Sequence, residues 1–136
     1  MNNQILTIRN MALLIFLIVL TGACSNTKSN KMIGVWKVDN VDVRFDEQKV
    51  NPQTLEQVIA TEKETILHFM DDSTMHIIMG ETNQKAYWSM EEAILFYYFD
   101  GSPLNVYELG KLVDEKIETE TQTPVGSIRI TYIKSE

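Results

Sequence analysis

The sequence predicts an all-β domain, an antiparallel up-and-down eight-stranded β-barrel with one short helix between its first two strands. Short runs rich in β-branched and aromatic residues alternate between apolar and polar side chains, which is typical of half-buried strands. Turn residues separate these runs at intervals of about 8–12 residues, as in sandwiches and barrels. Short connections favour pairing between consecutive strands, and a meander of this size removes its exposed edges by closing on itself.

The first strand and the helix are expected near the start of the domain. Residues 32–45 hold β-formers in a partly alternating order and predict the first strand. Asn51 is a favourable N-cap and Pro52 suits the first helical position, so a helix is expected over residues 52–63. Its apolar side chains recur three and four positions apart, as one helix face requires: Leu55, Val58 and Ile59.

Seven further strands are expected after the helix, at residues 65–70, 74–79, 85–90, 94–99, 104–109, 112–121 and 127–134. Turns are expected at residues 71–73, 80–83, 100–103 and 124–126, where Gly, Pro, Asp and Asn gather. In the hairpin around residues 71–73, a three-residue loop would place Phe69 opposite Met75 and His68 opposite His76. Two histidines do not complete a metal site, so we expect an outward-facing pair and no bound metal.

The N-terminal segment predicts export. Residues 1–10 are polar with one positive charge, residues 11–20 are all apolar, and small residues follow before Cys24. This is the layout of a secretory signal peptide, and ten apolar residues are too few to span a bilayer. We therefore expect residues 1–23 to be removed, residues 24–31 to form a polar tether, and residues 32–136 to form the barrel domain.

The cleavage region resembles the lipobox of bacterial lipoproteins, with Leu20 and three small residues before Cys24, although Leu20 lies one position further from the cysteine than usual. The resemblance implies a diacylglycerol on the sulfur of Cys24 and an acyl chain on its amino group, which together would anchor the protein stably. No acidic run follows Cys24, which favours a periplasm-facing position in the cell envelope.

Charge and cysteine content exclude several function classes. The formal net charge is −7, and it becomes −8 once the segment that contains Arg9 is removed. Such a surface repels phosphate backbones and anionic lipid, so nucleic acid is not expected as a partner and membrane attachment would be covalent. One cysteine permits no intramolecular disulfide. No nucleophile–base order, phosphate loop or paired-carboxylate motif is visible, so we expect no enzyme, no catalytic residues and no cofactor.

The start of the first strand, Gly34-Val35-Trp36, resembles the Gly-X-Trp motif with which lipocalins begin their barrel. In that family the Trp closes the base of the barrel and an Arg from the last strand packs over it. The resemblance therefore assigns structural roles at the barrel base to Gly34, Trp36 and Arg129. It implies a lipocalin-like lipoprotein that binds a small apolar ligand or a lipid.

The aromatic hairpin between residues 85 and 99 is the candidate wall of a ligand cavity. Half of its aromatic residues would face inward in a barrel: Tyr87, Trp88, Phe96, Tyr97, Tyr98 and Phe99. We assign the possible cavity lining to Tyr87, Trp88, Phe96 and Tyr98. The alternative is that these side chains simply fill the core, since small barrels are normally packed inside. The domain would then be a non-catalytic envelope scaffold or interaction module, for which the sequence indicates no particular protein partner.

Overall fold

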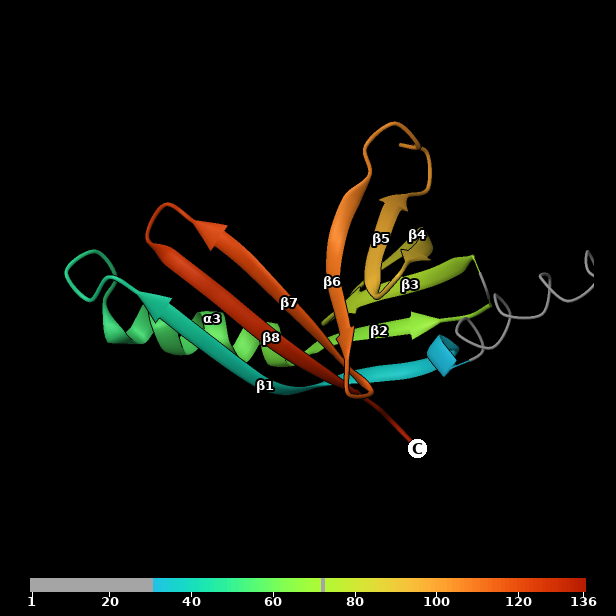
Figure 1. The fold of residues 1–136 in the computed structure, drawn as a ribbon. Helices are drawn as coiled ribbons and strands as arrows, with labels where there is room; N and C mark the ends of the chain where they lie inside the picture. Colours follow the sequence, from blue (N-terminus) through green and yellow to red (C-terminus); the bar gives the residue numbers. More distant parts are fainter. Residues whose placement is uncertain (1–30, 72) are drawn as a thin grey trace, which may run out of the picture. The chain divides into compact units, whose positions relative to one another are not determined.

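The structure, a computed structural model, describes residues 31–71 and 73–136 (Figure 1). The predicted signal peptide and Cys24 lie outside these residues. Met32–Glu136 forms one compact unit. Its elements are β1 (Gly34–Phe45), α3 (Pro52–Lys63), β2 (Thr65–Phe69), β3 (Thr74–Met79), β4 (Thr82–Glu91), β5 (Ile94–Phe99), β6 (Tyr107–Val113), β7 (Lys116–Thr123) and β8 (Gly126–Lys134).

The strands pair antiparallel in sequence order, and β1 pairs with β8 to close the barrel. The predicted fold class, an eight-stranded antiparallel barrel with a short helix between its first two strands, is therefore confirmed. Closure follows from the alternation of side chains, because each strand has an apolar face that must be covered and the ends of an open meander would leave unpaired edges.

Helix α3 has the predicted bounds, and its local chemistry explains them. The side-chain oxygen of Asn51 accepts a hydrogen bond from the main-chain N–H of Thr54 at 2.8 Å, which caps the first turn. Pro52 occupies the start of the helix, and Lys63 lies in the last turn, where a positive charge suits the helix dipole. The helix contacts β1 and runs beside its second half (Figure 1).

The β2–β3 hairpin has the predicted register, with Phe69 opposite Met75 and His68 opposite His76. Asp71 holds the turn, because its Oδ1 accepts hydrogen bonds from the main-chain N–H groups of Ser73 at 2.9 Å and of Thr74 at 2.6 Å.

Two predicted turns are misplaced. The connection before β4 is the two-residue turn Gly80–Glu81, so β4 begins at Thr82 instead of at residue 85. The strands predicted at residues 104–109 and 112–121 leave residues 110–111 as their connection, but the turn between β6 and β7 lies at Asp114 and Glu115, which both have positive φ. Non-glycine residues seldom adopt positive φ, so Gly110 was the more obvious turn residue in the sequence.

One end of the barrel is filled by aromatic and aliphatic side chains. The rings of Trp36 and Phe69 meet edge to face with centroids 6.5 Å apart, and those of Phe69 and Trp88 do so at 4.9 Å. The buried core of the barrel as a whole consists of Met32, Trp36, Leu67, Phe69, Met75, Ile77, Ala86, Trp88, Leu95, Ile117, Ile130 and Tyr132. Packing at this end fixes the positions of the strands that diverge at the other.

Candidate functional site

The other end of the barrel contains a cavity of about 290 Å³ that is open to solvent, where β2 begins and β3 and β5 end. This volume is close to the lower end of small-molecule pockets, which begin at roughly 300 Å³. Its lining combines apolar side chains with a few polar groups: Glu62, Thr65, Leu67, Ile77, Met79, Tyr97, Phe99, Glu108, Leu109, Thr119, Thr121, Ile130 and Tyr132.

The cavity exists because β6 and β7 pair over only a short stretch. Their ladder runs from Lys111 opposite Glu118 to Val113 opposite Lys116, whereas β7 pairs with β8 along its whole length. Beyond that ladder the two strands diverge, as Figure 1 shows. The remainder of β7 therefore has a strand neighbour on one side only within the described part of the chain.

An irregularity in β6 lies where the strands separate. Leu95 pairs with Gly110 but Phe96 pairs with Glu108, so Leu109 is an extra residue on β6. Such a bulge bends a strand and ends its regular pairing, and bulges are common at barrel rims and beside binding sites. Gly110 has φ +156°, and a Cβ there would collide with the main-chain carbonyl oxygen of Glu118. Only glycine fits this close approach without strain.

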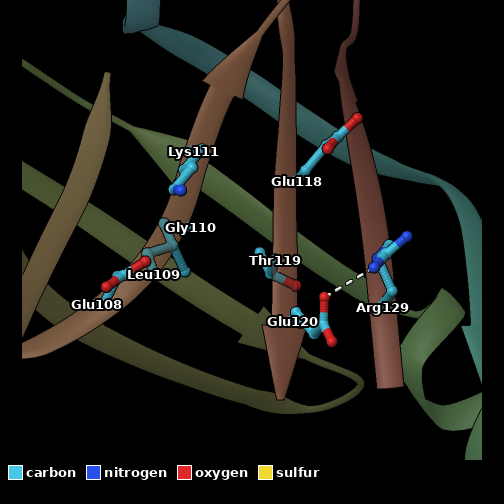
Figure 2. A pocket seen from close by; sticks show the side chains of 8 residues that line it. All are labelled: Glu108, Leu109, Gly110, Lys111, Glu118, Thr119, Glu120 and Arg129. Carbon is cyan, nitrogen blue, oxygen red and sulfur yellow. Dashed lines mark hydrogen bonds and ion pairs between the residues drawn. The ribbon is translucent and has the colours of Figure 1, made fainter. Parts of the chain in front are cut away.

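The gap between β6 and β7 forms a polar cleft of about 570 Å³ (Figure 2). It is lined by Glu108, Leu109, Gly110, Lys111, Glu118, Thr119, Glu120 and Arg129. Arg129 donates a hydrogen bond to the carboxylate of Glu120 at 2.8 Å, which spans β7 and β8 on the wall of the cleft. The cleft and the cavity share Glu108, Leu109 and Thr119, so the two lie next to each other on β6 and β7.

Three titratable side chains face the cavity in low-polarity surroundings. Burial raises the pKa of the Glu62 carboxyl above its ordinary value. Burial also raises the pKa of the Tyr132 hydroxyl, and the nearby charge of Glu62 adds to this effect. The pKa of Tyr97 is raised by its own burial and then by Tyr107. The two tyrosines therefore remain neutral hydrogen-bonding groups beside a carboxyl that is costly to leave ionised without a partner.

Thr65 is a further polar group in this wall. The residue is 5% exposed, and its Oγ1 has no hydrogen-bond partner in the described part of the chain. A buried hydroxyl without a partner costs about 1–3 kcal/mol, so such groups usually have a compensating contact. Thr65 lines the cavity, but its Oγ1 is itself buried in the wall, so a bound molecule would reach it only if neighbouring side chains moved.

The predicted cavity residues lie elsewhere. Trp88 points inward but belongs to the packed end, where its Nε1 donates to the main-chain oxygen of Asp71 at 3.0 Å. Tyr87 and Tyr98 stack on each other with ring centroids 5.2 Å apart, on the face of the sheet opposite Trp88. Phe96 is also absent from the cavity lining. The prediction therefore chose the wrong face of β5.

The inward-facing residues of β5 are Leu95, Tyr97 and Phe99, and the last two line the cavity. The run ILFYYF is apolar on both faces, so alternation could not show which half of it points inward. The contribution of Glu62 and Thr65 was also missed. They lie just before and just after the end of the helix, and only the closed barrel brings them against β8.

The three residues assigned to the barrel base have different positions. Trp36 is buried, and its Nε1 donates to the main-chain oxygen of Met32 at 2.8 Å. Gly34 has φ +132°, and a Cβ there would lie 2.7 Å from the Cε of Lys134. Arg129 lies opposite Asp42 on the exposed wall of the cleft, so it does not pack over Trp36. Lys134 is the residue of β8 that pairs with Trp36.

The histidine pair lies outside this site. His76 shares a hydrogen bond of 2.7 Å between its Nδ1 and the Oδ1 of Asn83 on β4. Within residues 31–71 and 73–136, no group of three or more His, Cys, Asp or Glu side chains is arranged to hold a metal ion.

No protein-family model, curated protein or solved structure matches this chain. None of the helices in the described residues is long and apolar enough to cross a bilayer.

Proposed function

We propose that this protein is a lipocalin-like lipoprotein of the bacterial cell envelope, anchored through a lipid on Cys24 and binding a small apolar ligand or lipid in its barrel. The observation that carries the binding function is the cavity of about 290 Å³ at one end of a closed eight-stranded barrel. A barrel of eight strands is about wide enough to hold one small ligand. The cleft between β6 and β7 adjoins this cavity, and we expect the ligand to enter and leave on that side.

The composition of the wall supports binding over simple packing. Apolar side chains such as Ile77, Phe99 and Ile130 line the same cavity as Thr65, whose hydroxyl has no partner among the described residues. Ligand pockets commonly combine a mostly apolar lining with a few polar groups that orient the ligand. A barrel selected only for stability would gain by filling this volume and by replacing Thr65 with an apolar residue.

Native mass spectrometry of the purified protein tests the binding function. We expect a bound species heavier than the polypeptide by the mass of one small molecule, which is lost when the protein is denatured. A matched variant, Ile77→Trp, adds volume to the cavity wall and should abolish the bound species while the barrel remains folded by circular dichroism. A protein that carries no small molecule from any source, and that binds no added apolar probe, would contradict the proposal.

The anchor is tested in bacterial cells by labelling with a fatty-acid probe. We expect the unchanged chain to be labelled and fractionated with membranes, and Cys24→Ala to lose both properties. Ser25→Ala, at the neighbouring position, is the matched control and should retain them. Labelling of Cys24→Ala would contradict the anchor and leave the binding function to be judged separately.

A non-catalytic interaction module is the second candidate. It is favoured by apolar side chains exposed between β5 and β6, where Leu104 is 95% and Val106 is 58% exposed. Exposed apolar groups of this kind mark contact surfaces when they are contiguous. A protein without bound small molecule in the mass spectrometry experiment would favour this candidate.

A further inference from the structure

The charged groups that line the cavity are all acidic. Glu62 and Glu108 are its ionisable residues besides the two tyrosines, and no Lys, Arg or His side chain is among the described residues of its wall. In the adjoining cleft, Arg129 is already bonded to Glu120, and Lys111 lies opposite Glu118 in the β6–β7 ladder. The chain as a whole carries a net charge of −7. An anionic ligand would therefore enter against the field of the protein and meet no cation inside.

The polar groups at the helix end offer acceptors to a ligand. Glu62 lies near the end of α3 and Thr65 begins β2, and both side chains line the cavity together with Tyr132. Among the described residues, the Oγ1 of Thr65 has no hydrogen-bond partner and the half-buried carboxyl of Glu62 has no ion-pair partner. An ammonium group has three N–H donors and a positive charge, which match a carboxylate and a hydroxyl oxygen.

We propose that the cavity takes a small cationic amphiphile, a primary amine on a short apolar chain, with the ammonium group beside Glu62 and Thr65 and the chain against Leu67, Ile77 and Ile130. This inference rests on the proposed binding function and names its ligand class. A carboxylic acid of the same length is disfavoured, because its headgroup would face Glu62 and Glu108 without a compensating charge. An uncharged alcohol would bind through burial and Thr65 alone.

The size of the cavity limits the length of the chain. A cavity of about 290 Å³ suits molecules of modest size, so the test uses eight-carbon ligands rather than long-chain lipids. Octylamine, 1-octanol and octanoate share one apolar chain and differ in the charge of the headgroup. Burial of the apolar chain contributes to the affinity of all three ligands. Differences in affinity among them therefore report the interaction of the headgroup with Glu62.

The experiment measures the affinity of each ligand for the purified full chain by isothermal titration calorimetry. The same is done for Glu62→Gln and for Glu56→Gln, which removes an equal charge from an exposed position of the same helix. All proteins are measured in the same buffer and detergent. The fraction of each ligand that partitions into detergent is then the same for every variant and does not affect the comparison. We expect Glu62→Gln to weaken octylamine roughly tenfold, as the loss of a desolvated charge pair would, and to change 1-octanol by less than about twofold. Glu56→Gln should leave all three unchanged.

The possible failures are distinguishable. Equal weakening of octylamine and 1-octanol by Glu62→Gln, or no weakening of either, overturns the amine inference while the binding function stands. Failure of all three ligands to bind the unchanged chain overturns the binding function as well. If Glu62→Gln does not fold, the salt dependence of the unchanged chain decides: octylamine affinity should fall as salt rises while that of 1-octanol does not, and equal dependence overturns the inference.

Discussion

The indole N–H of Trp36 donates to the main-chain oxygen of Met32 at 2.8 Å, and both residues are buried where the barrel is packed. Trp36→Phe keeps an aromatic ring but leaves that buried oxygen unpaired. We expect the free energy of unfolding to fall by about 1–3 kcal/mol, measured by urea denaturation. Trp88→Phe is the matched comparison, because its partner oxygen belongs to the exposed Asp71 and water can replace the indole. An equal loss in both variants would contradict this account of Trp36.

Gly110 approaches the main chain of Glu118 where β6 leaves β7. Gly110→Ala should lower the free energy of unfolding by roughly 2–4 kcal/mol, because the new Cβ meets a backbone carbonyl and the positive φ is strained. Gly101→Ala has the strain without the collision, since nothing lies within 4 Å of a Cβ there, and should cost about 1 kcal/mol. Similar values for the two variants would show that the approach to Glu118 does not constrain the barrel.

Thr65→Val should stabilise the protein. The substitution preserves the shape of the side chain and replaces a buried, unpaired hydroxyl with a methyl group. We expect thermal unfolding to shift upward, by an amount equivalent to about 1 kcal/mol. Thr119→Val, at a second buried threonine of the same cavity whose hydroxyl oxygen is not fully enclosed, should bring no such gain. A destabilised Thr65→Val would mean that the hydroxyl has a partner in solution.

The lowered pKa of Asp71 predicts that the folded protein loses stability in acid. Hydrogen bonds from the main-chain N–H of Ser73, and then from Thr74, lower its pKa from 3.8 to about 2. A carboxyl with a lowered pKa in the folded state stabilises that state above its ordinary pKa, and the contribution is lost as pH falls through the lowered value. We therefore expect the contribution of Asp71 to disappear between about pH 4 and pH 2. Asp71→Asn keeps an acceptor oxygen but does not titrate.

The measurement is urea denaturation across this range of pH. The unchanged protein should lose more stability than Asp71→Asn between pH 4 and pH 2, and the carbon-13 shift of the Asp71 carboxyl should titrate near 2. Parallel curves for the two proteins would show that the turn does not depend on the ionised carboxylate.

Local signals predicted the elements whose chemistry is contained within a few residues. The bounds of α3 follow from Asn51, Pro52 and the spacing of the apolar residues after them. The β2–β3 register follows from a single assumption, that the buried faces of both strands must coincide. In both cases the interactions that decide the structure lie close together in the sequence.

Two details that depend on distant partners were not predicted. Gly110 is indistinguishable in the sequence from a turn glycine, and its real role depends on the approach of Glu118. Arg129 was assigned to the barrel base, but the β1–β8 register places it opposite Asp42. Each residue of register shift moves a side chain by about 3.3 Å along the strand, so the register decides which residues meet.

The sequence by itself determined the alternation of apolar and polar residues, and with it the strands, the single helix and the closed meander. Only the tertiary structure decided where the barrel is filled and where it is hollow. The hydrophobic effect drives apolar side chains into the core. It does not specify which face of a strand turns inward when both faces are apolar, as in the strand that contains Tyr97 and Phe99. The cavity results from the divergence of β6 and β7, a relationship between strands that neither strand encodes alone.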